Sequence, residues 1–291
     1  MCRTVPSGFH CRSGFLKSAL LAILVAVVSP ATTFAWGREA HEMINAAAIR
    51  TLPQPLRGYF QSHQFYLVAH ASDPDILAHE NPGEQKHHFA DVEAFDSYPF
   101  TRFRQQFVEE RLPPTRRESE NGDAMWQIER FTLRLAADFR TSNWTAANHD
   151  AVFAAHYAAD LTQPLHTVLN YDGQKTGQEG IHKRFETGVV RYYSDRWTLQ
   201  PSAAARIINL RKRIFDEFLK SYKASHAVFA ADKEARKRFP YSSRGFLPAF
   251  CRLAGPLAES QIDDAANFVG SLWYTAWVRA GKPDLGGWKG R

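Results

Sequence analysis

The chain has 291 residues, 44% of them hydrophobic, and a formal net charge of +6 at pH 7. This length supports one large core, and no internal repeat, low-complexity tract or domain linker divides the sequence. Residues 1–35 contribute three of the positive charges, and the remaining +3 is too small and diffuse to indicate a nucleic-acid partner.

Residues 1–35 are typical of a secretory signal peptide, in which a charged region precedes an apolar run and a small-residue end. The charged residues are Arg3, Arg12 and Lys17. The apolar run, 19–28, is shorter than the roughly 20 residues that a membrane-spanning helix needs. We therefore expect cleavage after Ala35 and a secreted or periplasmic protein of residues 36–291 without a transmembrane segment. Cleavage would leave Cys251 with no intrachain partner, and nothing predicts a stable protein partner.

Apolar residues recur at helical spacing along much of the remaining chain. The three clearest series are Ile128, Phe131, Leu135 and Phe139; Ile207, Leu210, Ile214, Phe218 and Tyr222; and Ile262, Ala265, Val269, Leu272 and Ala276. Pro256 fits a helix start and Gly281 a helix stop. Prolines and glycines from about Asn81 to Gly122 predict a long irregular excursion. Few alternating β-branched runs occur, so we predict an all-α, single-domain helical bundle with long irregular loops.

The segment AAHYAADLTQPLH and the following GIHKRFET concentrate residues that bind metal ions. His156 and Asp160 are four residues apart, as are His182 and Glu186, so each pair shares one face if it lies on a helix. The proline before His166 is expected to end or bend the first helix and to direct His166 into the same cavity. Neutral imidazole and carboxylate suit zinc, so the segment predicts two metal positions. The alternative is that these residues are surface polar groups or hydrogen-bonded core histidines.

The expected mature N-terminus offers a further set of ligands. A free α-amino group at Trp36, together with the carbonyl oxygen of the same residue, forms a five-membered chelate around a cation. His41, five residues further on, is placed to complete that site. The alternative is that Trp36 is a buried aromatic anchor.

WGREAH, ASDPD, HHFADVE, HYAADLTQPLH and IHKRFE occur in the order seen in a known superfamily. From Trp36 to about Glu186 the chain resembles the trinuclear-zinc phospholipases C and single-strand-specific nucleases. The resemblance implies that three zinc ions bind. It implies one zinc held by Asp73, His88, His156 and Asp160, a second held by His166, His182 and Glu186, and a third held by Trp36, His41 and a bridging Asp160.

Two of these ligands rest on the resemblance alone and have close alternatives. Asp75 is an alternative to Asp73, and His87 stands beside His88. The family has a pattern of histidine, aromatic residue, any residue and aspartate. His88, Phe89 and Asp91 resemble this pattern, which favours His88 as the ligand. Asp91 then has a role outside the metal ligands, because it could orient an imidazole through the second ring nitrogen. The alternative is that Asp91 is a solvent-exposed loop carboxylate.

The motifs combine features of both branches of the superfamily. Trp36-Gly37 with a nearby His41, and the QPLH that ends at His166, resemble the nucleases. Glu186 resembles the phospholipases, whose last ligand pair ends in Glu, and the Gly-Gly-Asn stretch of many nucleases is missing here. We expect a secreted zinc-dependent phosphodiester hydrolase with single-stranded nucleic acid as substrate, and phospholipid as the alternative.

The expected chemistry follows from clustered zinc. Such ions lower the pKa of bound water to about 7, and a pair about 3.5–4 Å apart can bind both the attacking and the bridging oxygen. The resemblance makes Asp73 the candidate general base. Aromatic residues near the ligands in sequence are candidates for base stacking or for the core: Tyr66, Phe89, Tyr157 and Tyr171. The competing hypothesis is a non-catalytic binding protein whose zinc sites have no open position.

Overall fold

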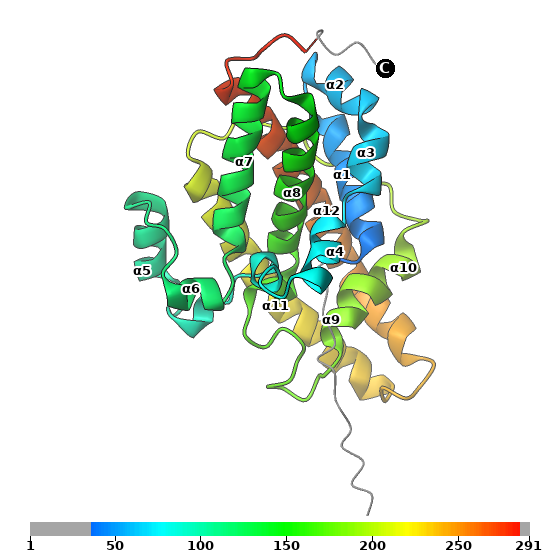
Figure 1. The fold of residues 1–291 in the computed structure, drawn as a ribbon. Coiled ribbons are helices and arrows are strands. Elements are labelled where there is room, and N and C mark those ends of the chain that lie inside the picture. Colours follow the sequence, from blue (N-terminus) through cyan, green and yellow to red (C-terminus); the bar gives the residue numbers. More distant parts are fainter. Residues whose placement is uncertain (1–35, 286–291) are drawn as a thin grey trace, which may run out of the picture. The chain divides into compact units, whose positions relative to one another are not determined.

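Helices account for all the regular secondary structure of residues 36–285, the part of the chain that this computed structural model describes (Figure 1). No β-strand occurs in that range, which confirms the all-α prediction. The expected signal peptide, residues 1–35, lies outside the described residues. Within 36–285, no helix is both long enough and apolar enough to cross a bilayer.

The long helices are α1 (Arg38–Thr51), α7 (Ala124–Thr141), α8 (Trp144–Thr162), α11 (Leu210–Arg238) and α12 (Phe246–Arg279). The short α-helices are α2 (Leu56–Ser62), α3 (Gln64–Ala69), α4 (Asp73–Glu80), α5 (Thr101–Arg104), α6 (Arg116–Glu120), α9 (Ile181–Lys183) and α10 (Val190–Tyr193). The 3-10 helices are η1 (Gln85–His88), η2 (Val92–Ala94) and η4 (Pro164–Thr167), and the π-helices are η3 (Gln105–Glu109) and η5 (Arg184–Val189).

Helix α12 runs through the core and packs against α1, α7, α8 and α11 (Figure 1). Its Trp273 is fully buried and stacks on Phe60 of α2, with ring centroids 4.5 Å apart. At Gly270, a Cβ would lie only 2.0 Å from the Thr51 hydroxyl oxygen. Glycine therefore allows α1 and α12 to approach more closely than any other residue would permit.

Helices α7 and α8 form an antiparallel hairpin, and α8 carries ligand candidates into the interior (Figure 1). Ser142 adopts the left-handed conformation (φ 57°) at the end of α7, and the Asn143 side chain accepts the Ala146 N–H to cap α8. From Asp150 onward α8 is buried all round, and small alanines make this close packing possible. His156 and Asp160 are thereby removed from solvent.

The C-terminal helix differs from the prediction at its start. Pro256 does not begin a helix but lies inside α12, which begins at Phe246. A proline inside a helix removes one hydrogen bond and costs about 3 kcal/mol, so packing on both sides of Pro256 must offset that cost. The predicted stop is observed, because α12 ends at Arg279 and Gly281 follows with φ 89°.

The predicted irregular excursion between α4 and α7 contains only short helical turns. Its two ends lie side by side, since the N–H of Asp91 donates to the Asn121 carbonyl and the N–H of Ala124 to the Phe89 carbonyl. Gly122 has φ 95°, and a Cβ there would meet the Phe89 carbonyl oxygen at 2.3 Å. The closed ends fix the turn that carries His88 against α8.

Candidate metal centre

Three groups of buried histidine and carboxylate side chains meet beside α8. They are His41, His156 and Asp160; Asp75, His88 and His156; and His166, His182 and Glu186. In each group the potential ligand atoms all lie within 4.8 Å of one another. His156 belongs to two of these groups, so the first two form one continuous cluster.

The group around His156 has the spacing of a tetrahedral zinc site. Ligand atoms about 2.1 Å from a tetrahedral zinc ion lie roughly 3.4 Å from one another. Asp75 Oδ1 lies 3.4 Å from His156 Nε2 and 3.6 Å from His88 Nδ1. Asp160 Oδ2 lies 3.3 Å from His156 Nε2 and 2.9 Å from His88 Nδ1. Four atoms from α4, η1 and α8 thus surround a position of the right size.

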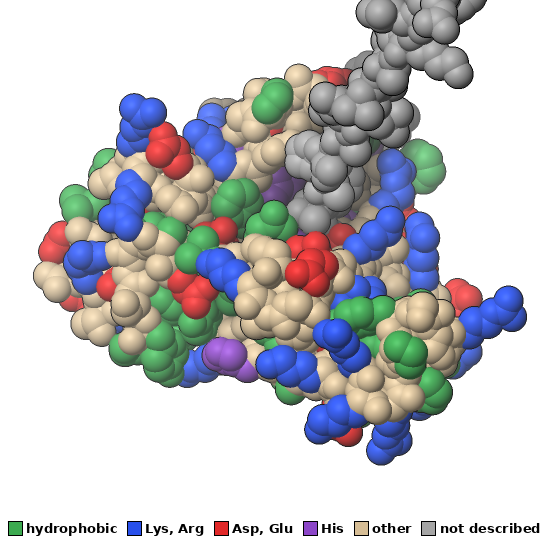
Figure 2. All heavy atoms as spheres, turned by 90° about the horizontal axis from the view of Figure 1, so that it is seen from below, with side chains coloured by type: hydrophobic (Ala, Val, Ile, Leu, Met, Phe, Trp, Pro, Cys, Tyr) green, Lys and Arg blue, Asp and Glu red, His purple; other side chains and the backbone are tan. Residues whose placement is uncertain are grey.

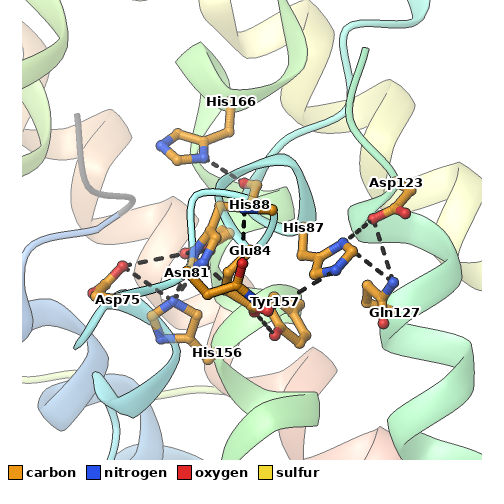
Figure 3. Close-up of polar contacts among 12 residues, drawn as sticks. Asp75, Asn81, Glu84, His87, His88, Asp123, Gln127, His156, Tyr157 and His166 are labelled. Atoms are coloured by element: carbon orange, nitrogen blue, oxygen red, sulfur yellow. Dashed lines mark hydrogen bonds and ion pairs between the residues drawn. The ribbon is translucent and has the colours of Figure 1, made fainter. Parts of the chain in front are cut away.

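The structure differs from the prediction in the carboxylate that α4 contributes. Asp75 faces the histidines, whereas the side chain of Asp73 is 38% exposed and accepts a hydrogen bond from His70 Nδ1 at 2.7 Å. Both belong to ASDPD, and only the orientation of α4 against α8 decides between them. Of the two adjacent histidines, His88 joins the group, while His87 pairs with Asp123 (Figure 3).

The group of His166, His182 and Glu186 combines His166, which follows the end of α8, with a later helical segment. Helix α8 ends at Thr162, and Pro164 begins η4, as the sequence predicts, so His166 points to a different position from His156. His182 Nε2 lies 3.0 Å from His166 Nε2 and 3.0 Å from Glu186 Oε2. Glu186 lies in the π-helix η5, a type of turn that is frequent at functional sites.

The group of His41, His156 and Asp160 connects α1 to the other carboxylate oxygen of Asp160. His41 Nε2 lies 3.2 Å from Asp160 Oδ1, and its ring stacks on His156 at 4.0 Å. The two oxygens of Asp160 therefore face different imidazoles, which is the arrangement of a carboxylate that bridges two metal positions. Trp36 is fully buried, with its ring 5.6 Å from that of Phe185 and its Nε1 donating to Thr162 at 3.4 Å. These contacts match the alternative of a buried aromatic anchor, and they involve only the side chain of Trp36.

Backbone carbonyl groups fix the orientation of two imidazoles. His156 Nδ1 donates to the Ala71 carbonyl at 2.8 Å, and His166 Nδ1 donates to the His88 carbonyl at 2.6 Å. Each Nε2 is thereby left as a lone pair that faces the metal position. Within residues 36–285, the Asp91 carboxylate forms no hydrogen bond or ion pair with an imidazole, although it lies close enough to His182 for their charges to interact, and its orienting role stays a prediction.

Several ligand atoms are buried without a hydrogen bond. They are His41 Nε2, Asp75 Oδ1, His88 Nε2, Asp160 Oδ1, His182 Nδ1 and Glu186 Oε2. Nearly all buried polar groups in native proteins have such a partner, so a concentration of exceptions in one place requires an explanation. Four of the six are atoms that face a metal position, and the donor set suits zinc. The residues present therefore fit a zinc ion in each group.

Burial and charge pairing act in opposite directions in the cluster around His156. Burial favours neutral His156, but the carboxylates of Asp160 and Asp75 outweigh burial and raise the pKa of His156 to about 9. Burial also opposes ionisation of Asp160, yet the charge of His156 and the adjacent imidazoles of His41 and His88 hold the pKa of Asp160 well below its usual range. The carboxylates of this cluster therefore favour a positive charge between them, which either a proton on His156 or a bound cation supplies.

The pKa shifts in the group of His166, His182 and Glu186 have different causes. Burial raises the pKa of Glu186 to about 7, even though His182 acts in the other direction. Burial and the neighbouring His182 lower the pKa of His166 to about 3, so this imidazole is neutral at physiological pH. A neutral imidazole is the form that binds metals.

Sequence reasoning missed a buried carboxylate beside His88. Glu84 lies four residues before His88, accepts a hydrogen bond from the Tyr157 hydroxyl, and has Oε1 4.0 Å from His88 Nε2 (Figure 3). The spacing of Glu84 and His88 was a usable signal. Tyr157 is itself buried, so it belongs to this network and is not free to stack on a base.

The centre is close to solvent on one face. In the face that Figure 2 draws, histidine is visible in a hollow between other side chains. A cavity of about 210 Å³ reaches Glu186 and is also lined by Gly37, Arg38 and Arg191. Tyr171 is 41% exposed, and its ring centroid lies 6.0 Å from that of His182. Of the four aromatic residues singled out in the sequence, Tyr171 alone is both exposed and in ring contact with a ligand.

No protein-family model matches this chain, and no curated protein matches it either.

Proposed function

We propose that this protein is a zinc-dependent phosphodiester hydrolase that binds three zinc ions. The observation that carries the proposal is the convergence of three groups of buried ligand atoms on His156, Asp160 and their neighbours. Their 2.9–3.6 Å separations around His156 match those of a tetrahedral site. The resemblance to the zinc phospholipases C and nucleases supplies the reaction class.

The proposed ligand set follows the geometry. Asp75, His88, His156 and Asp160 hold the first zinc, and a second is held by His166, His182 and Glu186. A third is held by His41, by Asp160 acting as a bridge, and by the amino group and carbonyl of Trp36 once the preceding residues have been removed. Asp75 takes the place that the resemblance gave to Asp73.

Hydrolysis of a phosphodiester needs a nucleophile at neutral pH and a balance for the negative charge that grows on the phosphoryl oxygens. Bound zinc supplies both, since it lowers the pKa of water and attracts those oxygens. The carbonyls of Ala71 and His88 hold His156 and His166 in one tautomer, so the site is preorganised before substrate arrives. The Asp75 carboxylate, beside His88 and His156, is the proposed proton acceptor.

Single-stranded nucleic acid is the proposed substrate because of Tyr171. A half-exposed tyrosine ring beside His182 is suited to stack on a base, and such stacking contributes roughly 1–3 kcal/mol per base. Phospholipid is the second candidate, which the glutamate at position 186 favours. A non-catalytic zinc-binding protein is the remaining hypothesis, and catalysis itself distinguishes it.

The test uses the protein with Trp36 as its first residue, loaded with zinc. Zinc content is measured by elemental analysis, and hydrolysis is followed on single-stranded DNA, RNA, phosphatidylcholine and the generic diester bis(p-nitrophenyl) phosphate. We expect about three zinc ions per chain and cleavage of a nucleic acid. Three zinc ions without hydrolysis of any of the four compounds would leave only the binding-protein hypothesis.

Replacement of Tyr171 by alanine tests the substrate class. Loss of one stacked base should raise KM for single-stranded DNA by roughly 5- to 150-fold while leaving bis(p-nitrophenyl) phosphate hydrolysis unchanged. Tyr98→Ala is the control, because Tyr98 is also exposed but its ring contacts are with Phe100 and Tyr222. Equal KM values for the Tyr171 variant and the control would argue against stacking at this position.

A further inference from the structure

One buried carboxylate, Asp232 of α11, secures the segment that carries His182 and Glu186. Asp232 is fully buried. Its Oδ1 accepts Arg184 Nη2 at 2.8 Å and Nε at 3.2 Å. Its Oδ2 accepts the Tyr241 hydroxyl at 2.7 Å and Gln178 Nε2 at 3.1 Å. Both oxygens are thus occupied by donors from two separate parts of the chain, the segment from Gln178 to Arg184 and Tyr241.

Arg184 transmits this anchor to the ligand segment. It lies two residues after His182 and two before Glu186. Its Nη1 donates to the Glu179 carbonyl at 2.7 Å and its Nη2 to the Gln178 carbonyl at 2.9 Å. The guanidinium also lies over the ring of Tyr241 at 4.6 Å. Arg184 therefore ties the loop before α9 to α11 on the side away from the metal ligands.

The segment needs such an anchor because it has little stability of its own. Helix α9 has only three residues and continues through the π-helix η5 into α10, and a helical stretch from 181 to 193 is still short enough to be marginal in isolation. The preceding loop contains Gly173, Gly177 and Gly180, all with positive φ. Glycines increase the number of conformations that the loop can adopt. The Asp232 carboxylate gives this segment a polar fixed point in addition to the burial of Ile181 and Phe185.

We infer that Asp232 and Arg184 are positioning residues for the metal position formed by His166, His182 and Glu186. The inference rests on the proposed function, since it assumes that this group binds zinc. Neither side chain contacts a metal ligand atom. Their role is to fix the backbone at Gln178 to Arg184, so that the imidazole and the carboxylate reach one ion at the same time.

A second buried carboxylate provides a matched control. Glu129 of α7 is also buried and binds two arginines, Arg211 Nε at 2.7 Å and Arg111 Nη2 at 2.9 Å. Arg211 in turn donates to the Phe107 and Leu112 carbonyls in the excursion after α5. The Glu129 network therefore stabilises a part of the fold that carries none of the three residues of this metal group.

The experiment compares Asp232→Asn, Glu129→Gln and the unchanged protein by zinc content, chelator competition and thermal unfolding. Asparagine and glutamine each present an NH₂ group to the donors that the native carboxylate binds, so both variants should unfold at lower temperature. Asp232→Asn should lower the affinity for one of the three zinc ions by about 10- to 100-fold, as expected for a residue that supports metal ligands. Glu129→Gln should retain all three affinities. In a His182→Ala background, Asp232→Asn should remove no further zinc.

A milder variant guards against a folding defect. Arg184→Lys keeps the positive charge but lacks the planar fork, so it should give a zinc affinity between those of the unchanged protein and Asp232→Asn. Unchanged zinc affinity in Asp232→Asn, or equal zinc loss in Asp232→Asn and Glu129→Gln, would overturn the positioning role alone. A lack of zinc in the unchanged protein would overturn the proposed function and the positioning role together.

Discussion

Replacement of Asp75 by asparagine should remove most phosphodiesterase activity, whereas the same replacement at Asp73 should change activity less than about twofold. Asp75 Oδ1 lies 3.4 Å from His156 Nε2 and 3.6 Å from His88 Nδ1, so the change removes a ligand charge inside the cluster. Loss of a positioned proton acceptor typically costs 10²–10⁴-fold in rate. That factor corresponds to roughly 3–5 kcal/mol of transition-state stabilisation.

The expected effect at Asp73 is small for a physical reason. The Asp73 and His70 side chains are 38% and 43% exposed, and an exposed ion pair contributes at most about 1 kcal/mol to folding stability. The two variants are matched because they differ by two positions in one helix and remove the same charge. Asp73→Asn should therefore retain zinc, stability and rate.

The assay measures zinc per chain and kcat on bis(p-nitrophenyl) phosphate for both variants at one pH. Asp75→Asn should lose zinc from the position that contains His88 and His156, together with activity. An inactive Asp73→Asn beside an active Asp75→Asn would refute the assignment of Asp75 and with it the proposed geometry of α4.

Three further outcomes are expected. Asp160→Asn should lose about two zinc ions by elemental analysis and Glu186→Gln only one, because Asp160 directs its two oxygens to different imidazoles; equal losses would rule out a bridge. Chelation should lower Tm, measured by calorimetry, by roughly 5–10 °C for each site that was held at 100 times its Kd, and an unchanged Tm would contradict coupled metal binding and folding. A methionine retained before Trp36 should cost one zinc and most activity, because an amide nitrogen is a poor ligand, while His182 and Glu186 keep theirs. Full zinc content in that extended protein would return Trp36 to the role of an aromatic anchor alone.

Features that depend on near neighbours in the chain could be predicted from the residues alone. Helical periodicity predicted the all-α class, because a helix repeats every 3.6 residues whatever surrounds it. The four-residue spacing of His156 and Asp160 put both on one face, and the proline after them ended the helix before His166. These are local properties, which a few consecutive residues decide.

Contacts between side chains of different elements could not be predicted in this way, because they depend on how the helices pack. Asp73 and Asp75 are nearly equivalent in sequence, and the packing of α4 against α8 selects Asp75. Pro256 reads as a helix start, but contacts along α12 offset the missing hydrogen bond. The Ala71 carbonyl that orients His156 and the Asp232 carboxylate that holds Arg184 come from positions 85 and 48 residues away. Such pairings depend on how the whole chain buries its apolar surface, and no short segment encodes them.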